Sequence, residues 1–189
     1  MNSLATFVQS IHLFRIKTSK RYKNQNSPFD IPQRLAQVSK IAICPPDDPS
    51  EVETAYKIVP KLQSCFNNCQ VTIIIDESCA LPHIDLSGIK VLTFSAEDLS
   101  RYKMPKKQFQ QKLSIISCDM VIDLSLPYNF TNAVIAWTVG AQMRVGFYHP
   151  NREDMYNFLL RHKAGRAPEE AYQSLINYLV SDPEDNAPH

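Results

Sequence analysis

Short apolar runs recur along the chain from Lys40 onward and predict buried strands. Each run is almost continuously hydrophobic and rich in β-branched residues, as is typical of strands that are covered on both faces. The runs are KIAIC (40–44), QVTIIID (70–76), IKVLTF (89–94), DMVIDLS (119–125) and QMRVGF (142–147). Between and after these runs, apolar residues at helical spacing predict helices over 49–66, 96–103, 107–117, 129–139, 152–163 and 168–180.

This alternation of strands and helices predicts parallel βαβ units. The fold class is therefore α/β: a Rossmann-like, doubly wound parallel sheet of about five strands with helices on both faces. Signals at the helix ends agree with these elements. The segment Asp48-Pro-Ser-Glu51 has a capping residue, then Pro at the first helical position and Glu at the third. Gly140 directly follows the helix at 129–139, where a left-handed C-cap is expected.

A helical, basic extension precedes the first predicted strand. One face of a predicted helix over 4–16 carries its apolar residues, which are Leu4, Phe7, Val8, Ile11 and Phe14. A polar, basic linker follows, and Asp30 caps a short helix that ends near Ser39. The predicted organisation is an extension at 1–39, a Rossmann-like domain at 40–181 and a disordered tail at 182–189.

The apolar face of the helix at 4–16 needs a cover, because isolated helices of this length are marginal in water and exposed apolar patches favour association. Its own domain, a second copy of the chain and a membrane surface are the three candidates. The polar face offers Gln9, Ser10, His12 and Arg15, which is little basic charge for attraction to lipid. We therefore expect protein to cover this face, including by self-association, with peripheral membrane contact as the alternative.

Composition narrows the range of chemistry. The chain has 189 residues, of which 44% are apolar, so it is long enough for one well-buried domain. Its four glycines lie at least six residues apart, which excludes the glycine-rich loops that hold nucleotide phosphates. The five cysteines follow neither a disulfide framework nor the Cys-x-x-Cys spacing of a metal site. We therefore expect no metal and no cofactor.

Charge and hydropathy indicate the compartment and exclude one class of partner. Residues 1–40 hold seven Lys or Arg against one Asp, while residues 167–189 hold five acids and no Lys or Arg. Between them the charges balance, which gives no basis for nucleic-acid binding. No apolar run reaches the about 18 residues of a membrane-spanning helix, and the N-terminus lacks the basic start of a signal peptide. These features predict a cytoplasmic protein, with peripheral contact at the inner membrane as an open alternative.

The candidate ligand site lies at the carboxyl edge of the predicted sheet, where doubly wound folds bind their ligands. Segments 45–51, 76–80 and 125–132 leave predicted strands at that edge. The ligand-binding candidates there are Asp47, Ser50, Glu51, Asn129 and Asn132.

Structural roles compete with ligand binding for these side chains. Glu51 stands where the reciprocal partner of an Asp48 cap would be, and an Asn at a helix start is usually a cap. Asp123 belongs to a strand run, where a buried carboxylate bonded to a neighbouring loop is the alternative to a chemical role. His149 follows the last predicted strand, and it fits a surface loop as well as a ligand contact.

Two segments of the chain resemble family 9 glycosyltransferases, the lipopolysaccharide heptosyltransferase family. Residues 40–77 are similar to the family's opening strand, loop and helix, with matches at Lys40, Ile41, Val52, Leu62, Phe66, Val71 and Thr72. Residues 119–147 resemble the family's Asp-Leu-Val-Ile-Asp-Leu … Leu-Gly-Ala-x-x-Arg-Ile-Gly-Phe segment, with matches at Asp119, Val121, Ile122, Asp123, Leu124, Gly140, Ala141, Arg144, Val145, Gly146 and Phe147. The chain also resembles a short uncharacterised bacterial domain with a similar basic N-terminal extension.

The resemblance implies the acceptor-side half of such an enzyme. Family members have two Rossmann-like domains, and this chain is similar to the first, whereas the second holds the nucleotide-sugar donor. The family's catalytic base is an Asp after Gly that takes a proton from the acceptor hydroxyl, and here Glu51 after Ser50 stands in its place. Asp47 replaces a loop glycine, and Pro45 replaces a basic residue. Glu51 is thus the catalytic candidate if the chain is active, but these departures weigh against independent activity.

We therefore predict a binding or accessory module without independent transferase activity, which the resemblance places in bacterial cell-envelope glycan assembly. The implied partner is a glycan or glycolipid acceptor, and five basic residues between Arg101 and Lys112 would suit an anionic one. Two alternatives stay open. The chain is a glycosyltransferase component that completes its active cleft with another chain, or it is a structural interaction protein that docks through the helix at 4–16.

Overall fold

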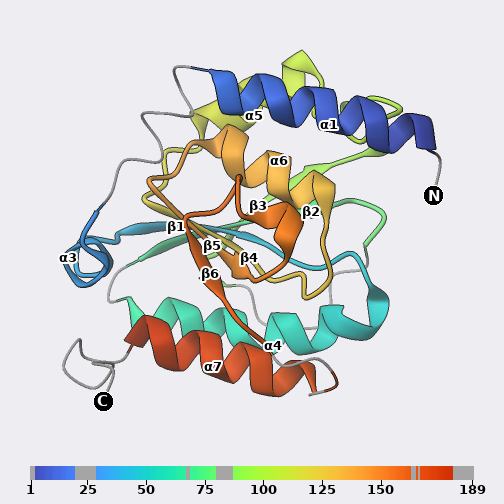
Figure 1. Cartoon of the computed structure of the whole chain (residues 1–189). Coiled ribbons are helices and arrows are strands. Elements are labelled where there is room, and N and C mark those ends of the chain that lie inside the picture. Colours follow the sequence, from blue (N-terminus) through green and yellow to red (C-terminus); the bar gives the residue numbers. More distant parts are fainter. Residues whose placement is uncertain are drawn as a thin grey trace.

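A six-stranded parallel sheet forms the centre of the molecule (Figure 1). The computed structural model describes residues 3–19, 29–66, 69–79, 87–162, 165 and 167–180. The strands are β1 (Lys40–Cys44), β2 (Gln70–Asp76), β3 (Lys90–Phe94), β4 (Met120–Asp123), β5 (Met143–Phe147) and β6 (Phe158–Leu160). They lie in the order β3-β2-β1-β4-β5-β6, and each neighbouring pair is parallel. The predicted α/β class with a Rossmann-like sheet is therefore confirmed.

This strand order places a topological switch point between β1 and β4. From β1 the chain extends the sheet outward through β2 to β3, and from β4 it extends the sheet in the opposite direction to β6. In register, Ile41 pairs with Val71 on one side and with Met120 on the other. The loops after β1 and β4 therefore diverge at the carboxyl edge, which is where doubly wound folds place their ligands.

Helices cover both faces of the sheet (Figure 1). One face carries α4 (Pro49–Cys65) and α7 (Pro168–Val180). The other face carries α1 (Ser3–Thr18), α5 (Lys107–Ile115) and α6 (Phe130–Val139). As predicted, Asp48 caps α4, and Asp30 caps the short α3 (Ile31–Leu35).

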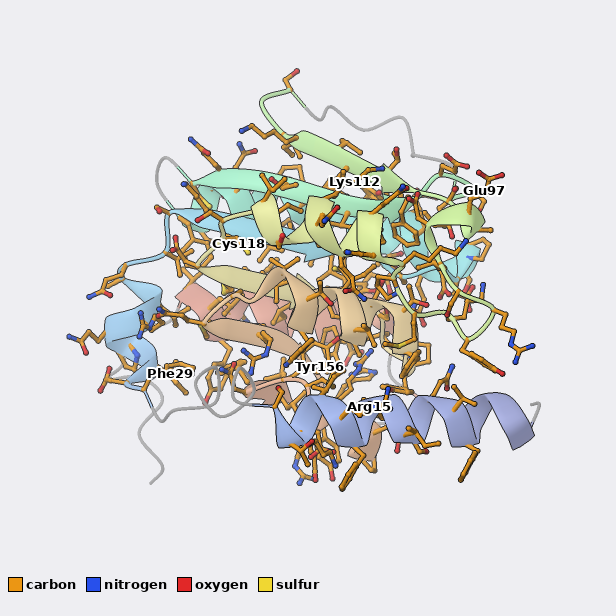
Figure 2. All side chains as sticks on the ribbon, turned by 90° about the horizontal axis from the view of Figure 1, so that it is seen from above. Arg15, Phe29, Glu97, Lys112, Cys118 and Tyr156 are labelled. Carbon is orange, nitrogen blue, oxygen red and sulfur yellow. The ribbon has the colours of Figure 1, made fainter. Side chains whose placement is uncertain are left out.

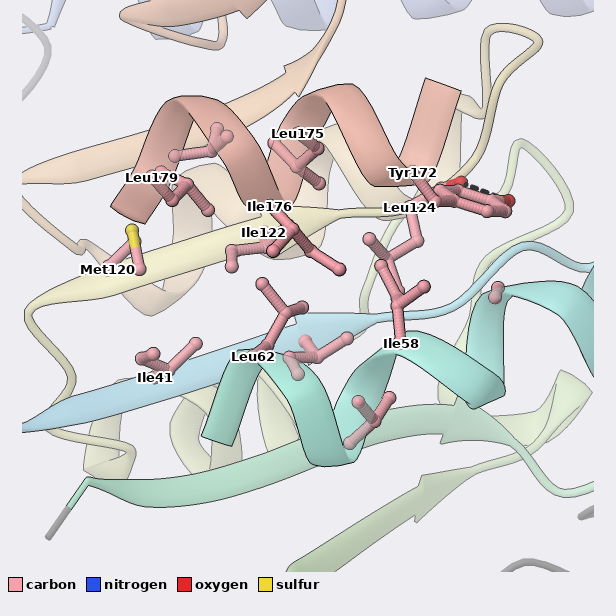
Figure 3. Packing of buried hydrophobic residues seen from close by; sticks show 14 of the residues in the cluster. Ile41, Ile58, Leu62, Met120, Ile122, Leu124, Tyr172, Leu175, Ile176 and Leu179 are labelled. Atoms are coloured by element: carbon pink, nitrogen blue, oxygen red, sulfur yellow. Dashed lines mark hydrogen bonds between the residues drawn. The ribbon is translucent and has the colours of Figure 1, made fainter. Parts of the chain in front are cut away.

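The sheet has one apolar core on each face, because successive strand residues alternate between the two faces. Ile41 and Ile43 contribute to the core under α4 and α7, whereas Ala42 and Cys44 contribute to the core under α5 and α6. Figure 3 shows the first of these cores, in which α4 and α7 lie side by side over β1 and β4. There the Tyr172 hydroxyl donates to the Leu124 carbonyl at 2.9 Å and fixes the start of α7 to the end of β4.

The helix predicted over 152–163 is wrong, and its segment supplies the sixth strand. The chain forms the 3-10 turn η2 (Pro150–Arg152) and then β6, whose residues pair with Val145, Gly146 and Phe147 of β5. A three-residue strand is too short to show a period of its own, so spacing alone favours a helix there.

The helix predicted over 96–103 is also wrong beyond its first turn. Ser95 caps the 3-10 turn η1 (Ala96–Asp98) with a reciprocal capping box. The chain then closes into a loop, because the Ser100 hydroxyl accepts from the backbone N–H groups of Tyr102 and Met104. These local bonds compete with helical ones.

The N-terminal helix α1 docks on the domain, but not through the predicted face. Ile16 is buried and Leu13 is half-buried against the core of the α5 and α6 face. Three residues of the face predicted to be covered, Phe7, Ile11 and Phe14, are exposed. Val8 is half-buried, and the side chain of Leu4 lies outside the described part of the structure. In two views at right angles, α1 lies along the outside of the molecule (Figures 1 and 2).

Polar contacts hold α1 in this orientation. Gln9 Nε2 donates to the Tyr102 carbonyl at 3.3 Å, and Lys17 Nζ forms an ion pair with Asp154 at 2.5 Å. Within the described residues, no helix combines the length and the hydrophobicity needed to cross a bilayer. The basic linker at 20–28 and the predicted tail at 182–189 lie outside the described residues, so the predicted domain boundaries stay predictions.

Two glycines occupy positions that a side chain would strain. Gly140 ends α6 with a φ of 81°, the left-handed C-cap that the sequence predicts. Gly146 lies in β5, where an added Cβ would stand 3.3 Å from the ring of Tyr156. Both glycines belong to the 119–147 segment: backbone geometry explains Gly140, and packing against Tyr156 explains Gly146.

Replacing Gly140 by Ala is expected to lower the free energy of unfolding by about 1–2 kcal/mol, because the new Cβ is strained at this positive φ. Gly140→Asn is the matched control, and it is expected to cost less, since Asn tolerates the left-handed region. Urea denaturation of the two variants measures the difference. Equal losses for Ala and Asn would contradict the conformational explanation.

Candidate ligand site at the carboxyl edge of the sheet

A cavity of about 250 Å³ opens at the carboxyl edge of the sheet beside the switch point. Its walls come from the loops after β1 and β2, from the end of β3, from the 99–103 loop and from the start of α6. The polar side chains that line it are Asp47, Asp76, Lys103, Tyr128, Asn129, Thr131 and Asn132. Cys79 and several apolar side chains complete the lining.

The structure divides the predicted ligand-binding residues into two groups. Asp47, Asn129 and Asn132 line the cavity, although they come from segments more than eighty residues apart. Ser50 and Glu51 are not among the residues that line it. Asp76, Lys103, Tyr128 and Thr131 line it as well.

Ser50 is engaged at the start of α4. The Asp48 carboxylate accepts from Ser50 N at 2.9 Å and from Ser50 Oγ at 2.7 Å. These two bonds lower the pKa of Asp48. Ser50 therefore completes the helix cap.

Glu51 does not form the predicted reciprocal bond with Asp48. Its Oε2 atom instead accepts from the backbone N–H of Leu126 at 3.4 Å, in the loop after β4. Partial burial raises the pKa of Glu51, the bond from Leu126 lowers it, and the nearby carboxylates of Asp48 and Asp47 raise it further. The carboxylate thus contacts the β4–α6 loop at Leu126, and Glu51 is not among the residues that line the cavity.

A buried polar cluster lies behind the cavity and was only partly foreseen. At its centre is Asp123, the last residue of β4, which is fully buried. Its Oδ2 atom accepts from the Tyr156 hydroxyl at 2.6 Å and lies 3.2 Å from the Arg152 guanidinium. Its Oδ1 atom accepts from Ser125 N at 3.0 Å and from Asn132 Nδ2 at 3.2 Å. The structural alternative for Asp123 is the one that these contacts favour.

Arg152 is the buried cation of this cluster, and the sequence analysis did not identify it as a candidate residue. The side chain is fully buried, and its guanidinium donates to the carbonyls of Phe147, Ser125 and Pro127 at 2.7–2.8 Å. Its partners thus come from the ends of β4 and β5, which only the folded sheet brings together. In the sequence, the one signal for this role is the position of Arg152, which comes two residues after His149-Pro150 and soon after the apolar run at 142–147.

Asn132 joins the cluster to the cavity wall. Its Nδ2 donates to the Pro45 carbonyl at 2.9 Å and to Ser125 Oγ at 3.0 Å, besides Asp123. The side chain is 4% exposed, so its amide is committed to the protein. Asn129 caps α6, with Oδ1 accepting from Asn132 N at 3.1 Å, as predicted.

Two tyrosines, Tyr156 and Tyr128, interact with the charges of the cluster. Burial, together with Asp123, raises the pKa of Tyr156 well above its ordinary value. Burial raises the pKa of Tyr128 to about 12, against the opposing effect of Arg152. The Tyr128 hydroxyl is buried and has no hydrogen-bond partner in the described part of the chain. Its ring stacks on that of His149, with centroids 5.2 Å apart.

His149 has a structural role in the loop after β5. Its Nδ1 atom accepts from Asn151 N at 3.1 Å and caps η2, the turn that carries Arg152. His149 is half-buried and is not among the residues that line the cavity.

Other residues that carry the family resemblance also hold backbone in place. Asp119 Oδ2 accepts from Ser39 N, Ser39 Oγ and Lys40 N at 2.9–3.0 Å, which joins the start of β4 to the start of β1. Burial alone would raise the pKa of Asp119, but these hydrogen bonds lower it. Arg144 is fully buried in β5 and donates to the carbonyls of Met155 and Ala141.

The cavity is equipped to bind a ligand rich in hydroxyl groups. Asp47 and Asp76 supply acceptors, Lys103 supplies a cation, and Thr131 supplies a hydroxyl that both donates and accepts. Apolar and aromatic walls stand beside these groups, as in small-molecule sites generally. Among the residues that the structure describes, no cluster of three or more His, Cys, Asp or Glu could hold a metal ion.

Comparisons of sequence give no relative for this chain. No family model matches it, and no curated protein matches it either.

Comparisons of structure find solved proteins with a similar fold. The family 9 glycosyltransferase of Veillonella parvula superposes with a TM-score of 0.54 at 16% identity, over 81% of this chain and 44% of that one. The heptosyltransferase WaaC of E. coli, solved with ADP, superposes with a TM-score of 0.60 at 14% identity, over 79% of this chain and 49% of that one. WaaC with ADP-2-deoxy-2-fluoro heptose gives a TM-score of 0.55. The chain therefore has the fold of part of a family 9 glycosyltransferase, and it spans about half the length of these proteins.

Removing the buried cation is expected to destabilise the protein strongly. Arg152→Met leaves the Asp123 carboxylate buried without its ion pair, at a cost of about 3–5 kcal/mol in unfolding free energy. The exposed Arg101→Met is the control, with an expected change within about 0.5 kcal/mol. In denaturation experiments, the double variant Asp123→Asn/Arg152→Met should lose less than the sum of its single variants, because no unpaired charge remains. Strict additivity would refute the coupling.

The stability of the Glu51→Gln variant relative to that of the wild type is expected to increase as the pH rises from about 4 to about 7. The pKa of Glu51 is raised in the folded state, so its contribution to stability is present below the unfolded pKa and is lost as the pH rises through the folded one. Glu53 in the same helix is the opposite control. Its ion pair with Lys57 lowers its pKa, so Glu53→Gln should become less favourable over the same range. Urea denaturation of both variants and the wild type at both pH values measures these changes in stability. If the two variants changed in the same direction, the raised pKa of Glu51 and the lowered pKa of Glu53 would be contradicted.

Proposed function

We propose that this chain binds a glycan or glycolipid acceptor in the carboxyl-edge cavity and does not transfer a sugar by itself. The observation that carries the proposal is the position of the cavity. It opens beside the switch point of a sheet whose fold is that of part of a family 9 glycosyltransferase. The matches at 40–77 and 119–147 support the acceptor-side half as the counterpart.

The side chains that are free to act on a ligand support a saccharide. Asp47 and Lys103 both line the cavity, and both are exposed. A carboxylate beside an ammonium group can accept from one sugar hydroxyl and donate to another. Lys103 also suits a phosphorylated acceptor, because ammonium groups pair with phosphate. This chemistry supports a role in assembling cell-envelope glycans such as lipopolysaccharide.

The position of Glu51 supports an accessory role over independent catalysis. A general base must come within hydrogen-bond reach of the proton that it takes. Glu51 instead faces Leu126 N and is not among the residues that line the cavity. A nucleotide-sugar would moreover need a phosphate-binding element, and the chain has no glycine-rich loop of that kind.

Titration calorimetry with a de-acylated lipopolysaccharide inner-core oligosaccharide tests the proposal. The wild type is expected to bind, and Asp47→Asn/Lys103→Met is expected to weaken binding about tenfold, since it removes two charge-assisted contacts. The matched control Glu97→Gln/Lys106→Met changes two exposed charges outside the cavity and should bind like the wild type. Both variants should melt like the wild type.

The same titration with ADP- and UDP-sugars is expected to give no micromolar binding. Tight binding of a nucleotide-sugar would overturn the accessory role and favour a glycosyltransferase component. Equal oligosaccharide affinities for the two double variants would overturn the cavity as the binding site.

A further inference from the structure

Helix α1 presents its most apolar face to solvent. Phe7, Ile11 and Phe14 are spaced by four and three residues, so they form one stripe along the helix. Their exposed fractions are 63%, 41% and 67%. Gln9 and Ile16 contact the domain, and each comes two residues after a residue of the stripe, Phe7 or Phe14. Two residues correspond to about half a helical turn, so the stripe lies on the opposite side of the helix.

The domain holds this stripe outward. Ile16 is buried against the core, and Gln9 and Lys17 tie the helix to Tyr102 and Asp154. Rolling α1 inward to cover the stripe would break these contacts. The exposure is therefore built into the docking of the helix, and none of the described residues covers the stripe, which makes it a candidate interaction surface.

Charge favours an anionic occupant. Residues 1–29 contain five Lys or Arg and no Asp or Glu. Within α1, Arg15 and Lys17 lie in the last turn, and both are exposed. Arg15 follows Ile11 by four residues and therefore flanks the stripe. Apolar side chains bordered by basic ones are typical of helices that lie in the interface of a bilayer with anionic lipids.

The area of the stripe disfavours a second copy. From their exposed fractions, the three side chains offer about 400 Å², since an aromatic side chain buries about 150–250 Å². A stable interface needs about 800 Å² from each partner. The described helix α1 also contains no Asp or Glu that could pair with the Arg15 of a second copy.

We propose that α1 is a membrane-docking element: Phe7, Ile11 and Phe14 enter the interfacial region of a bilayer, and Arg15, which flanks them, contacts the phosphates of anionic lipids. The helix lies parallel to the bilayer and keeps the domain on its other side. This inference is independent of the proposed function, because it uses no residue of the cavity.

Vesicle flotation of the full chain tests the inference. The protein is expected to float with vesicles of phosphatidylcholine containing about one third phosphatidylglycerol, and about tenfold less with phosphatidylcholine alone. Raising NaCl from about 0.1 to about 0.5 M should weaken the binding, because salt screens the basic groups.

Two double variants separate the stripe from general hydrophobicity. Phe7→Ser/Phe14→Ser is expected to lower the partition coefficient about tenfold, whereas Ile115→Ser/Val180→Ser, which removes exposed apolar side chains on α5 and α7, should leave it unchanged. No binding by the wild type, or equal binding by the two variants, would overturn the inference. A dimer in light scattering that Phe7→Ser/Phe14→Ser dissociates would also overturn it and assign the stripe to a second copy.

A substitution that keeps the stripe apolar gives an independent readout. In Phe14→Trp, the new indole should be quenched by vesicles whose lipids carry bromine on the upper acyl chain. The wild type, which has Trp137 as its one tryptophan, should be quenched much less, since Trp137 lies on α6 beneath α1. Equal quenching of the two proteins would contradict insertion at position 14.

Discussion

The carboxyl ends of β4 and β5 are held together by the buried guanidinium of Arg152. It donates to three carbonyls and pairs with Asp123, so the loop after β4, the turn after β5 and the start of α6 share one set of hydrogen bonds. A buried charge that loses its partner is strongly unfavourable, which leaves these three segments a single arrangement relative to one another. The cavity takes its shape from the same arrangement, since Asn132 links Asp123 to the Pro45 carbonyl in the wall.

The residues that carry the family resemblance are largely the ones that keep this framework in place. Asp119 joins the start of β4 to the start of β1, and Asp123 pairs with Arg152. Arg144 donates to the backbone carbonyls of residues 141 and 155, and Gly146 leaves room for the ring of Tyr156. Two of the departures from the family, Pro45 and Asp47, line the cavity where a ligand would be contacted, whereas Ser50 and Glu51 do not line it. The fold can therefore be shared while the chemistry at the edge differs, which is why fold alone does not establish function.

Local signals in the sequence predicted most elements and failed where distant contacts decide. The bounds of β1 and β2 agree with the apolar runs, because a buried parallel strand is continuously hydrophobic. Gly140 and the Asp caps were also predictable, since each acts on its own helix end. The sixth strand was not, because β6 is specified by pairing with β5. The partners of Arg152 and the outward face of α1 were missed for the same reason: each depends on residues far away in the chain. At the site, Asp47, Asn129 and Asn132 were found from their positions after strands, whereas Lys103 comes from a loop whose course only the fold determines. Tyr128 lies in the predicted segment 125–132 but was not singled out.

The switch point has a consequence for how the protein reaches its native state. β1 to β3 are consecutive in the chain, and so are β4 to β6, but the pairing that joins the two groups brings Ile41 beside Met120, 79 positions further on (120 − 41). Closing so long a loop costs conformational entropy before any contact repays it. The two groups of strands are thus natural units of assembly, with the β1–β4 seam as their junction. The cavity takes its walls from both units, so neither unit contains it alone, and the capacity to bind a ligand there arises with the docking of one half of the sheet on the other.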